Sequence, residues 1–98
     1  MARFSVHLNP NGGYLLDVQA DLMRHLNTRV VVPLMPLDQA PKPATRLNPL
    51  FMIDGVEHSM VTQFMAAVPA ADLGRIVMDV ADRRDDIVNA LDLLLQGS

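Results

Sequence analysis

The chain of 98 residues carries 8 Lys and Arg against 11 Asp and Glu, and half of its residues are hydrophobic. The acidic balance argues against a nucleic-acid binder that acts through a broad basic face, and the absence of cysteine excludes disulfides and cysteine-ligated metal. The length predicts a single domain over residues 1–98 whose core is marginal, because only 4% of the residues are aromatic. Dimerisation is therefore favoured, since it buries further apolar surface.

The sequence also predicts a cytoplasmic protein without membrane contact. Its apolar runs are too short to span a bilayer, and no apolar segment follows Arg3 as it does in a secretory signal.

The first two elements are predicted to form a β-hairpin. Polar residues alternate with Phe4, Val6 and Leu8, which is typical of a half-buried strand. Residues 9–13 read Asn-Pro-Asn-Gly-Gly and predict a turn rather than a phosphate loop, because no Lys-Ser/Thr pair and no helix start follow. Alternation resumes at Tyr14, Leu16 and Val18.

Residues 17–34 predict strand, turn and strand, with the turn inside residues 21–28. The run Val30-Val31-Val32, closed by Pro33, is stiff at χ1 and suits a pleated surface. A helical alternative remains at this point, since Leu15, Val18, Leu22 and Leu26 also lie at helical spacing.

Proline and glycine divide the rest of the chain. Residues 35–43 hold three prolines and predict a surface loop. Asp54-Gly55 between residues 50–53 and 56–65 predicts a second hairpin. Val68-Pro69 indicates a break, and residues 75–80 a last strand with Ile76, Met78 and Val80 on one face.

The chain ends in a predicted helix. An apolar stripe at helical spacing contains Ile87, Ala90, Leu91, Leu94 and Leu95. Acidic residues crowd its start (Asp82, Asp85 and Asp86), where they suit the helix dipole, and Gly97 suits a C-terminal cap.

No catalytic or metal-binding constellation is evident. His7, His25 and His58 are far apart and indicate structural histidines, although metal binding with other ligands stays open. The acidic residues that precede the helix could hold a divalent ion, and Arg83-Arg84 could contact phosphate, but a solvated helix surface explains both. The seven methionines could form an adaptable binding patch, but their scattered positions favour core filling. The residues alone thus predict a small, mostly β, dimeric interaction protein with no cofactor.

Four stretches together resemble the CcdB family of toxins. They are Asp17-Val18-Gln19-Ala20-Asp21, Arg29-Val30-Val31-Val32-Pro33-Leu34, Met65-Ala66-Ala67-Val68-Pro69 and Asp86-Ile87-Val88-Asn89-Ala90-Leu91-Asp92. Their order and spacing match over residues 4–97. The resemblance implies an SH3-like barrel of antiparallel strands, with a five-stranded and a small three-stranded sheet, and one C-terminal helix.

The resemblance also implies a non-enzymatic function. Family members are homodimers that bind the DNA gyrase A subunit and trap the cleaved-DNA complex. A CcdA-type antitoxin neutralises them, and the toxin–antitoxin complex represses its own operon, contacting operator DNA mainly through the antitoxin.

The family's gyrase contacts can be carried over by position. They fall on Leu22, Met23, Asp92, Leu95, Gln96, Gly97 and Ser98. The best-known family pattern ends in an aromatic residue followed by Trp-Gly-Ile, and only Gly97 is kept here. The departure keeps open a weakened or non-toxic homologue that binds antitoxin only. A MazF-like endoribonuclease on the same fold is a further alternative, although that activity needs cationic side chains along an RNA groove.

Overall fold

A computed structural model describes residues 2–97 of the chain. These residues form seven strands: β1 (Ser5–Leu8), β2 (Tyr14–Asp17), β3 (Thr28–Pro36), β4 (Leu50–Ile53), β5 (Val56–Met60), β6 (Ala66–Pro69) and β7 (Ile76–Asp79). Four short 3-10 helices lie between or after them: η1 (Asp21–Met23), η2 (Thr62–Phe64), η3 (Ala70–Asp72) and η4 (Ala81–Arg83). The α-helix α1 (Arg84–Gln96) follows η4.

The long strand β3 is shared by two parts of one curled antiparallel sheet. Its residues 28–31 pair with β6, and its residues 34–36 pair with β5. The order β6-β3-β2-β1-β7 therefore makes a five-stranded part, and β4-β5-β3 makes a three-stranded part. The predicted fold class, mostly β with an SH3-like sheet and one C-terminal helix, is confirmed.

The position of Pro33 explains why β3 continues beyond it. We expected Pro33 to close the strand and residues 35–43 to form a loop, but β3 runs to Pro36. Proline cannot donate to a ladder. Pro33 pairs with Leu15 of β2 on one edge of β3. On the other edge it lies where β3 changes partner from β6 to β5, so no ladder N–H is needed there, and its carbonyl accepts the Val61 N–H at 3.0 Å.

Both predicted hairpins are confirmed. Leu8 pairs with Tyr14 across the first turn, where the Asn9 N–H donates to the Gly13 carbonyl at 2.9 Å. Ile53 pairs with Val56 across Asp54-Gly55. The helical alternative for residues 17–34 is wrong, because β2 and β3 pair directly and the intervening chain forms only η1.

Three local expectations need correction. Strand β1 is buried on both faces rather than half-buried, since Ser5 and His7 are only 3% and 2% exposed. The chain at Val68-Pro69 is not a break but part of β6, an outer strand in which proline is tolerated because one side needs no ladder donor. The strand expected over residues 56–65 ends at Met60, where η2 follows.

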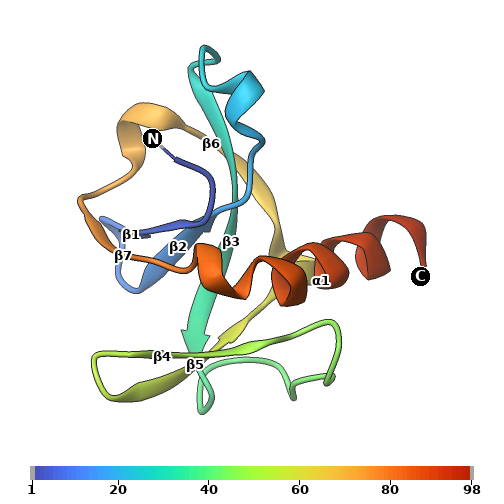
Figure 1. Ribbon diagram of the computed structural model, residues 1–98. Helices are drawn as coiled ribbons and strands as arrows, with labels where there is room; N and C mark the ends of the chain where they lie inside the picture. The colour runs from blue at the N-terminus through green and yellow to red at the C-terminus, as the bar shows by residue number, and fades with distance from the viewer. Residues whose placement is uncertain (1, 98) are drawn as a thin grey trace.

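The core lies between the concave face of the sheet and α1. Its sheet residues include Val6, Leu16, Val32, Leu34 and Met60, and its helix residues are Ile87, Ala90 and Leu91. Figure 1 shows α1 crossing in front of β3, with its C-terminal end projecting beyond the sheet. No helix within residues 2–97 has the length and apolarity that crossing a bilayer requires.

Candidate functional site: the end of helix α1 and the η1 loop

Helix α1 is buried at its centre and exposed at its C-terminal end. Ile87 and Ala90 are fully buried against the sheet. Along the same apolar stripe, Leu94 is 37% exposed and Leu95 is 65% exposed. The stripe is confirmed as helical, but its last turn extends past the sheet that covers the rest (Figure 1).

Gly97 ends the helix in the expected manner. Its φ of 75° is left-handed, and its N–H donates to the Leu93 carbonyl at 3.0 Å. Glycine adopts this conformation without a Cβ penalty. Within the last turn Gln96 is exposed and Asp92 is half-buried, so the backbone and side chains at the helix end are accessible.

Leu22 and Met23 lie in η1, where they are exposed by 82% and 46%. The short helix contributes no buried residue, so its shape depends on hydrogen bonds to neighbouring backbone. The buried side chain of Gln19 provides one of them: its Nε2 donates to the Met23 carbonyl at 2.9 Å, while its Oε1 accepts the Val30 N–H at 3.0 Å. The Arg3 N–H adds another, donating to Asp21 Oδ1 at 2.9 Å. Gln19 thus ties the loop to the start of β3.

Asp17 and Arg29 hold Gln19 in turn. The Gln19 N–H donates to Asp17 Oδ1 at 3.0 Å, and Arg29 Nε donates to Asp17 Oδ2 at 2.8 Å. Arg29 Nη2 lies 2.7 Å from the same oxygen, off the hydrogen-bond direction, and both side chains are at most 1% exposed. Residue-by-residue reasoning missed these three positioning residues, although Asp17 and Gln19 lie in the Asp17-Val18-Gln19-Ala20-Asp21 motif.

The sequence-derived site residues fall into two separate groups. The helix-end group contains Asp92, Leu95, Gln96 and Gly97, and the loop group contains Leu22 and Met23. Figure 1 shows η1, in light blue, well away from the C-terminal end of α1, so one chain does not bring the two groups together. Ser98 lies outside the described residues.

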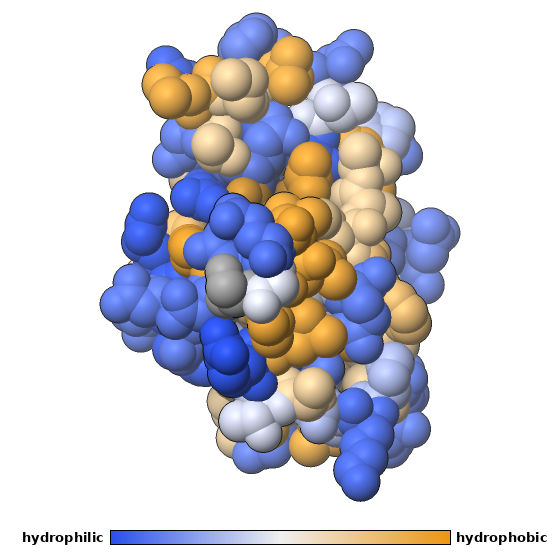
Figure 2. All heavy atoms as spheres, turned by 90° about the vertical axis from the view of Figure 1, so that its right-hand side faces the viewer, coloured by the Kyte–Doolittle hydropathy of each residue, from blue (hydrophilic) through white to orange (hydrophobic). Residues whose placement is uncertain are grey.

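Exposed apolar side chains lie on the last turn of α1 and on η2 beside the helix. We call this surface the apolar tip and define it as Phe64, Leu94 and Leu95. Phe64 is 49% exposed in η2, which packs against α1. Figure 2 shows apolar side chains gathered beside the end of α1. An exposed aliphatic and aromatic patch of this kind marks an interaction surface.

The histidines and acidic groups are the residues that could form a metal site within residues 2–97. No group of three or more His, Cys, Asp or Glu within residues 2–97 is placed to hold a metal ion. Of the three histidines His25 is exposed, whereas His7 and His58 are buried and engage backbone carbonyls through Nδ1, at 2.9 and 2.8 Å. Most exposed groups at the end of α1 and in η1 are apolar or amide side chains, which suit contact with a protein surface.

Comparison with known proteins identifies the family of the chain. The model of the CcdB family, described as CcdB protein, matches residues 3–97. The match spans nearly the whole sequence, and the chain therefore belongs to the CcdB family, the toxins of toxin–antitoxin systems that act with an antitoxin partner.

Proposed function

We propose that this protein is a single-domain, cytoplasmic toxin that acts as a homodimer, binds the A subunit of DNA gyrase and traps the complex in which DNA is cleaved. The observation that carries the proposal is the exposed apolar tip on a chain of the CcdB family. Leu95 is 65% exposed at the end of a helix whose earlier turns are buried, so the chain presents a protruding apolar surface to a partner.

The exposed apolar surface of a small chain supports the dimer, because pairing removes such surface from water. The η1 segment, which carries Leu22 and Met23, lies away from the C-terminal end of α1 within one chain (Figure 1), whereas a two-fold pair places the same patch from each copy on one assembly. In the proposed dimer the two α1 ends lie side by side and form a wedge between the gyrase A subunits.

The proposed action requires no catalysis by the toxin. A ligand that binds one conformation more tightly than the others raises the population of that conformation. The toxin is accordingly not an enzyme: it binds the cleaved-DNA state of gyrase preferentially, and a CcdA-type antitoxin competes for it. Together with its toxin the antitoxin also represses the operon.

A second candidate function, a homologue that binds antitoxin without poisoning gyrase, is favoured by the composition of the helix end. Leu95 and Gln96 stand where the best-known family pattern has aromatic residues, and Ser98 stands where it has Ile. A Trp over an arginine contributes about 1–2 kcal/mol when desolvated. Losing two such contacts in a dimer weakens binding by about 2–4 kcal/mol, roughly 30- to 1,000-fold.

The ribonuclease alternative has less support. The chain has only 8 Lys and Arg, and two of them, Arg29 and Arg83, are paired with carboxylates. A groove that follows an RNA backbone needs several free cations.

The gyrase proposal is tested by adding the purified toxin to gyrase and plasmid DNA and measuring covalently held, cleaved DNA. Leu95→Asp places a charge on the apolar tip and is expected to reduce cleaved DNA at least tenfold. Met52→Asp is the matched control, since Met52 is 57% exposed on β4, outside the apolar tip, and should leave cleavage unchanged.

Binding to a fragment of the host's gyrase A subunit and to the co-encoded antitoxin is measured in parallel. Binding to both partners supports the poison. Binding to antitoxin alone, with no cleaved DNA and no growth arrest on expression, overturns the gyrase proposal in favour of the second candidate.

A further inference from the structure

The turn that joins β1 to β2 presents the pair Asn11-Gly12 to solvent. Both residues are exposed, and apart from the chain neighbours no atom lies within 4 Å of the position that a Cβ of Gly12 would take. Gly12 has a φ of 102°, a conformation that glycine adopts readily and other residues rarely adopt. The pair belongs neither to the apolar tip nor to η1, so its chemistry is independent of the proposed gyrase contacts.

An asparagine that precedes glycine can react with its own backbone. The backbone nitrogen of the glycine loses its proton to solvent and attacks the side-chain Cγ, the bond from Cγ to the amide nitrogen breaks, and that nitrogen takes up a proton and leaves as ammonia. Water then opens the resulting succinimide ring at either carbonyl, which gives aspartate or isoaspartate. Glycine favours the ring closure because it carries no Cβ beside the attacking nitrogen.

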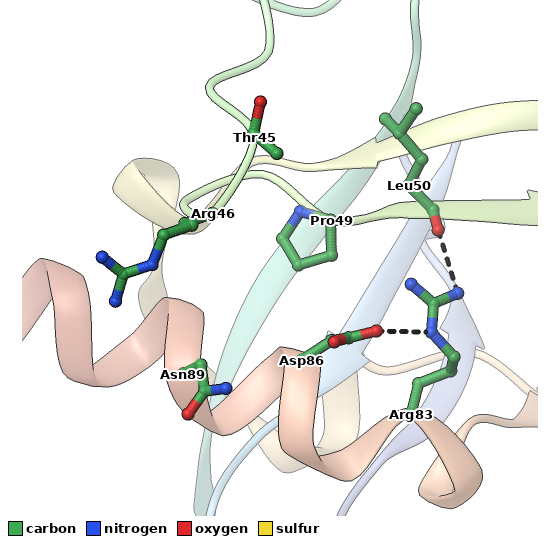
Figure 3. Close-up of a pocket in the computed structure, with 7 residues that line it drawn as sticks. All are labelled: Thr45, Arg46, Pro49, Leu50, Arg83, Asp86 and Asn89. Atoms are coloured by element: carbon green, nitrogen blue, oxygen red, sulfur yellow. Dashed lines mark hydrogen bonds and ion pairs between the residues drawn. The ribbon is translucent and has the colours of Figure 1, made fainter.

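The other asparagines of the chain each lack one of these conditions. Asn9 and Asn48 precede proline, whose nitrogen carries no hydrogen to lose. Asn27 precedes Thr28, whose β-branched side chain crowds the attacking nitrogen. Asn89 lies within α1, with helical turns on both sides (Figure 3). The helix fixes its backbone dihedral angles and engages the next N–H in a hydrogen bond, so that nitrogen is held away from Cγ.

Hydrogen bonds within the turn oppose the reaction at Asn11 only weakly. The Gly12 N–H, whose nitrogen would attack, donates to the Asn9 carbonyl at 2.8 Å, and the Asn11 N–H donates to Asn9 Oδ1 at 3.1 Å. The first bond must open before the ring can close. An exposed turn opens at little cost in free energy, because water replaces the lost partner. The fold therefore slows the attack without preventing it.

We propose that Asn11 is a site of spontaneous deamidation, at which solvent water is the only co-reactant. Each conversion adds one negative charge to a chain whose formal charge is -3. The isoaspartate product also lengthens the main chain between Asn11 and Gly12 by one methylene group. Asn11 lines a cleft of about 490 Å³ together with Leu15, Val68 and Asp72, so the conversion adds a second carboxylate to this cleft.

The test incubates the full chain at mildly alkaline pH, beside the blocked peptide acetyl-Pro-Asn-Gly-Gly-amide, and follows each asparagine by tryptic mapping and mass spectrometry. Trypsin cleaves after Arg3 and Arg24, and sequencing of that peptide by fragmentation separates Asn9 from Asn11. Asn11 is expected to change from amide to acid, as a mixture of aspartate and isoaspartate. Its rate in the folded chain should be about two- to tenfold below that of the peptide, the factor that one net hydrogen bond contributes.

Asn11→Gln is the matched variant, since the longer side chain keeps the amide but disfavours the smaller ring, and it should remove the conversion at this exposed turn position. Asn27 and Asn89 are controls within the same sample and should stay unconverted while Asn11 reacts. Thermal unfolding before incubation confirms that both chains are folded. An unchanged Asn11 after the peptide has reacted fully, equal rates at Asn27 or Asn89, or aspartate without isoaspartate would each overturn the proposal.

Discussion

Asp17 and Arg29 form an ion pair inside the sheet, with Arg29 Nη2 2.7 Å from Asp17 Oδ2 and both side chains at most 1% exposed. The pair joins neighbouring strands β2 and β3 below the η1 loop, and through Gln19 it determines how Leu22 and Met23 are presented. A buried pair of this kind contributes less to net stability than to a single arrangement of the chain.

Removing either member of the pair should strongly destabilise the fold. Asp17→Asn leaves a buried guanidinium without a countercharge, and Arg29→Met leaves a buried carboxylate. Each is expected to lower the free energy of unfolding by about 3–5 kcal/mol, measured by urea denaturation.

The double variant Asp17→Asn/Arg29→Met should lose much less than the sum of the two single losses, because neither charge remains unpaired. Strictly additive losses would show that the two groups do not stabilise each other.

Asn48 is expected to be essential for the loop that precedes β4. Its Oδ1 accepts the Ala44 N–H at 3.0 Å, and its Nδ2 donates to the Met60 carbonyl at 3.0 Å and to Gln63 Oε1 at 2.8 Å. Asn48→Ala should cost about 2–3 kcal/mol, because the buried Met60 carbonyl and the Ala44 N–H both lose a partner. Gln63→Ala removes only one of these bonds at an exposed position and should cost less than about 1 kcal/mol; a similar loss in both variants would contradict this account.

Gly74 should not tolerate a side chain. A Cβ there would lie 2.5 Å from the Leu8 carbonyl oxygen, which already accepts the Gly74 N–H at 2.9 Å. Gly74→Ala is expected to lower the free energy of unfolding by about 1–3 kcal/mol, because the backbone must move. Gly97→Ala is the comparison, since no atom lies within 4 Å of its Cβ position and only its left-handed φ is penalised. Gly97→Ala should cost at most about 1 kcal/mol. Thermal unfolding of the two variants tests whether Gly74→Ala is the more destabilising.

Ile87 should anchor α1 to the sheet. Its side chain is fully buried in the core, so Ile87→Ala is expected to cost about 2–5 kcal/mol through lost burial and a cavity. Leu95→Ala, on the same stripe but 65% exposed, should change stability by less than about 1 kcal/mol while it weakens gyrase binding. Equal losses in urea denaturation would mean that Leu95 packs inside the molecule.

Local sequence patterns were sufficient to predict an element whose conformation depends on residues within one short segment. Asp54-Gly55 predicted the second hairpin, and the spacing of Ile87, Ala90 and Leu91 predicted both α1 and its buried face. Pro33 and Val68-Pro69 were misleading, because the cost of a proline depends on whether a partner strand needs its N–H. That partner comes from a distant part of the chain.

The sequence by itself determined the mostly β class, the two hairpins and the C-terminal helix, since each depends on periodicity or turn residues along the chain. The SH3-like arrangement and the family followed from the resemblance of four stretches to the CcdB family. Only the tertiary structure decided that β3 is shared by β5 and β6, that Asp17 pairs with Arg29, and that Leu95 projects beyond the sheet. The physical reason is that periodicity specifies which face of an element is apolar, whereas the curl of the sheet decides what covers that face.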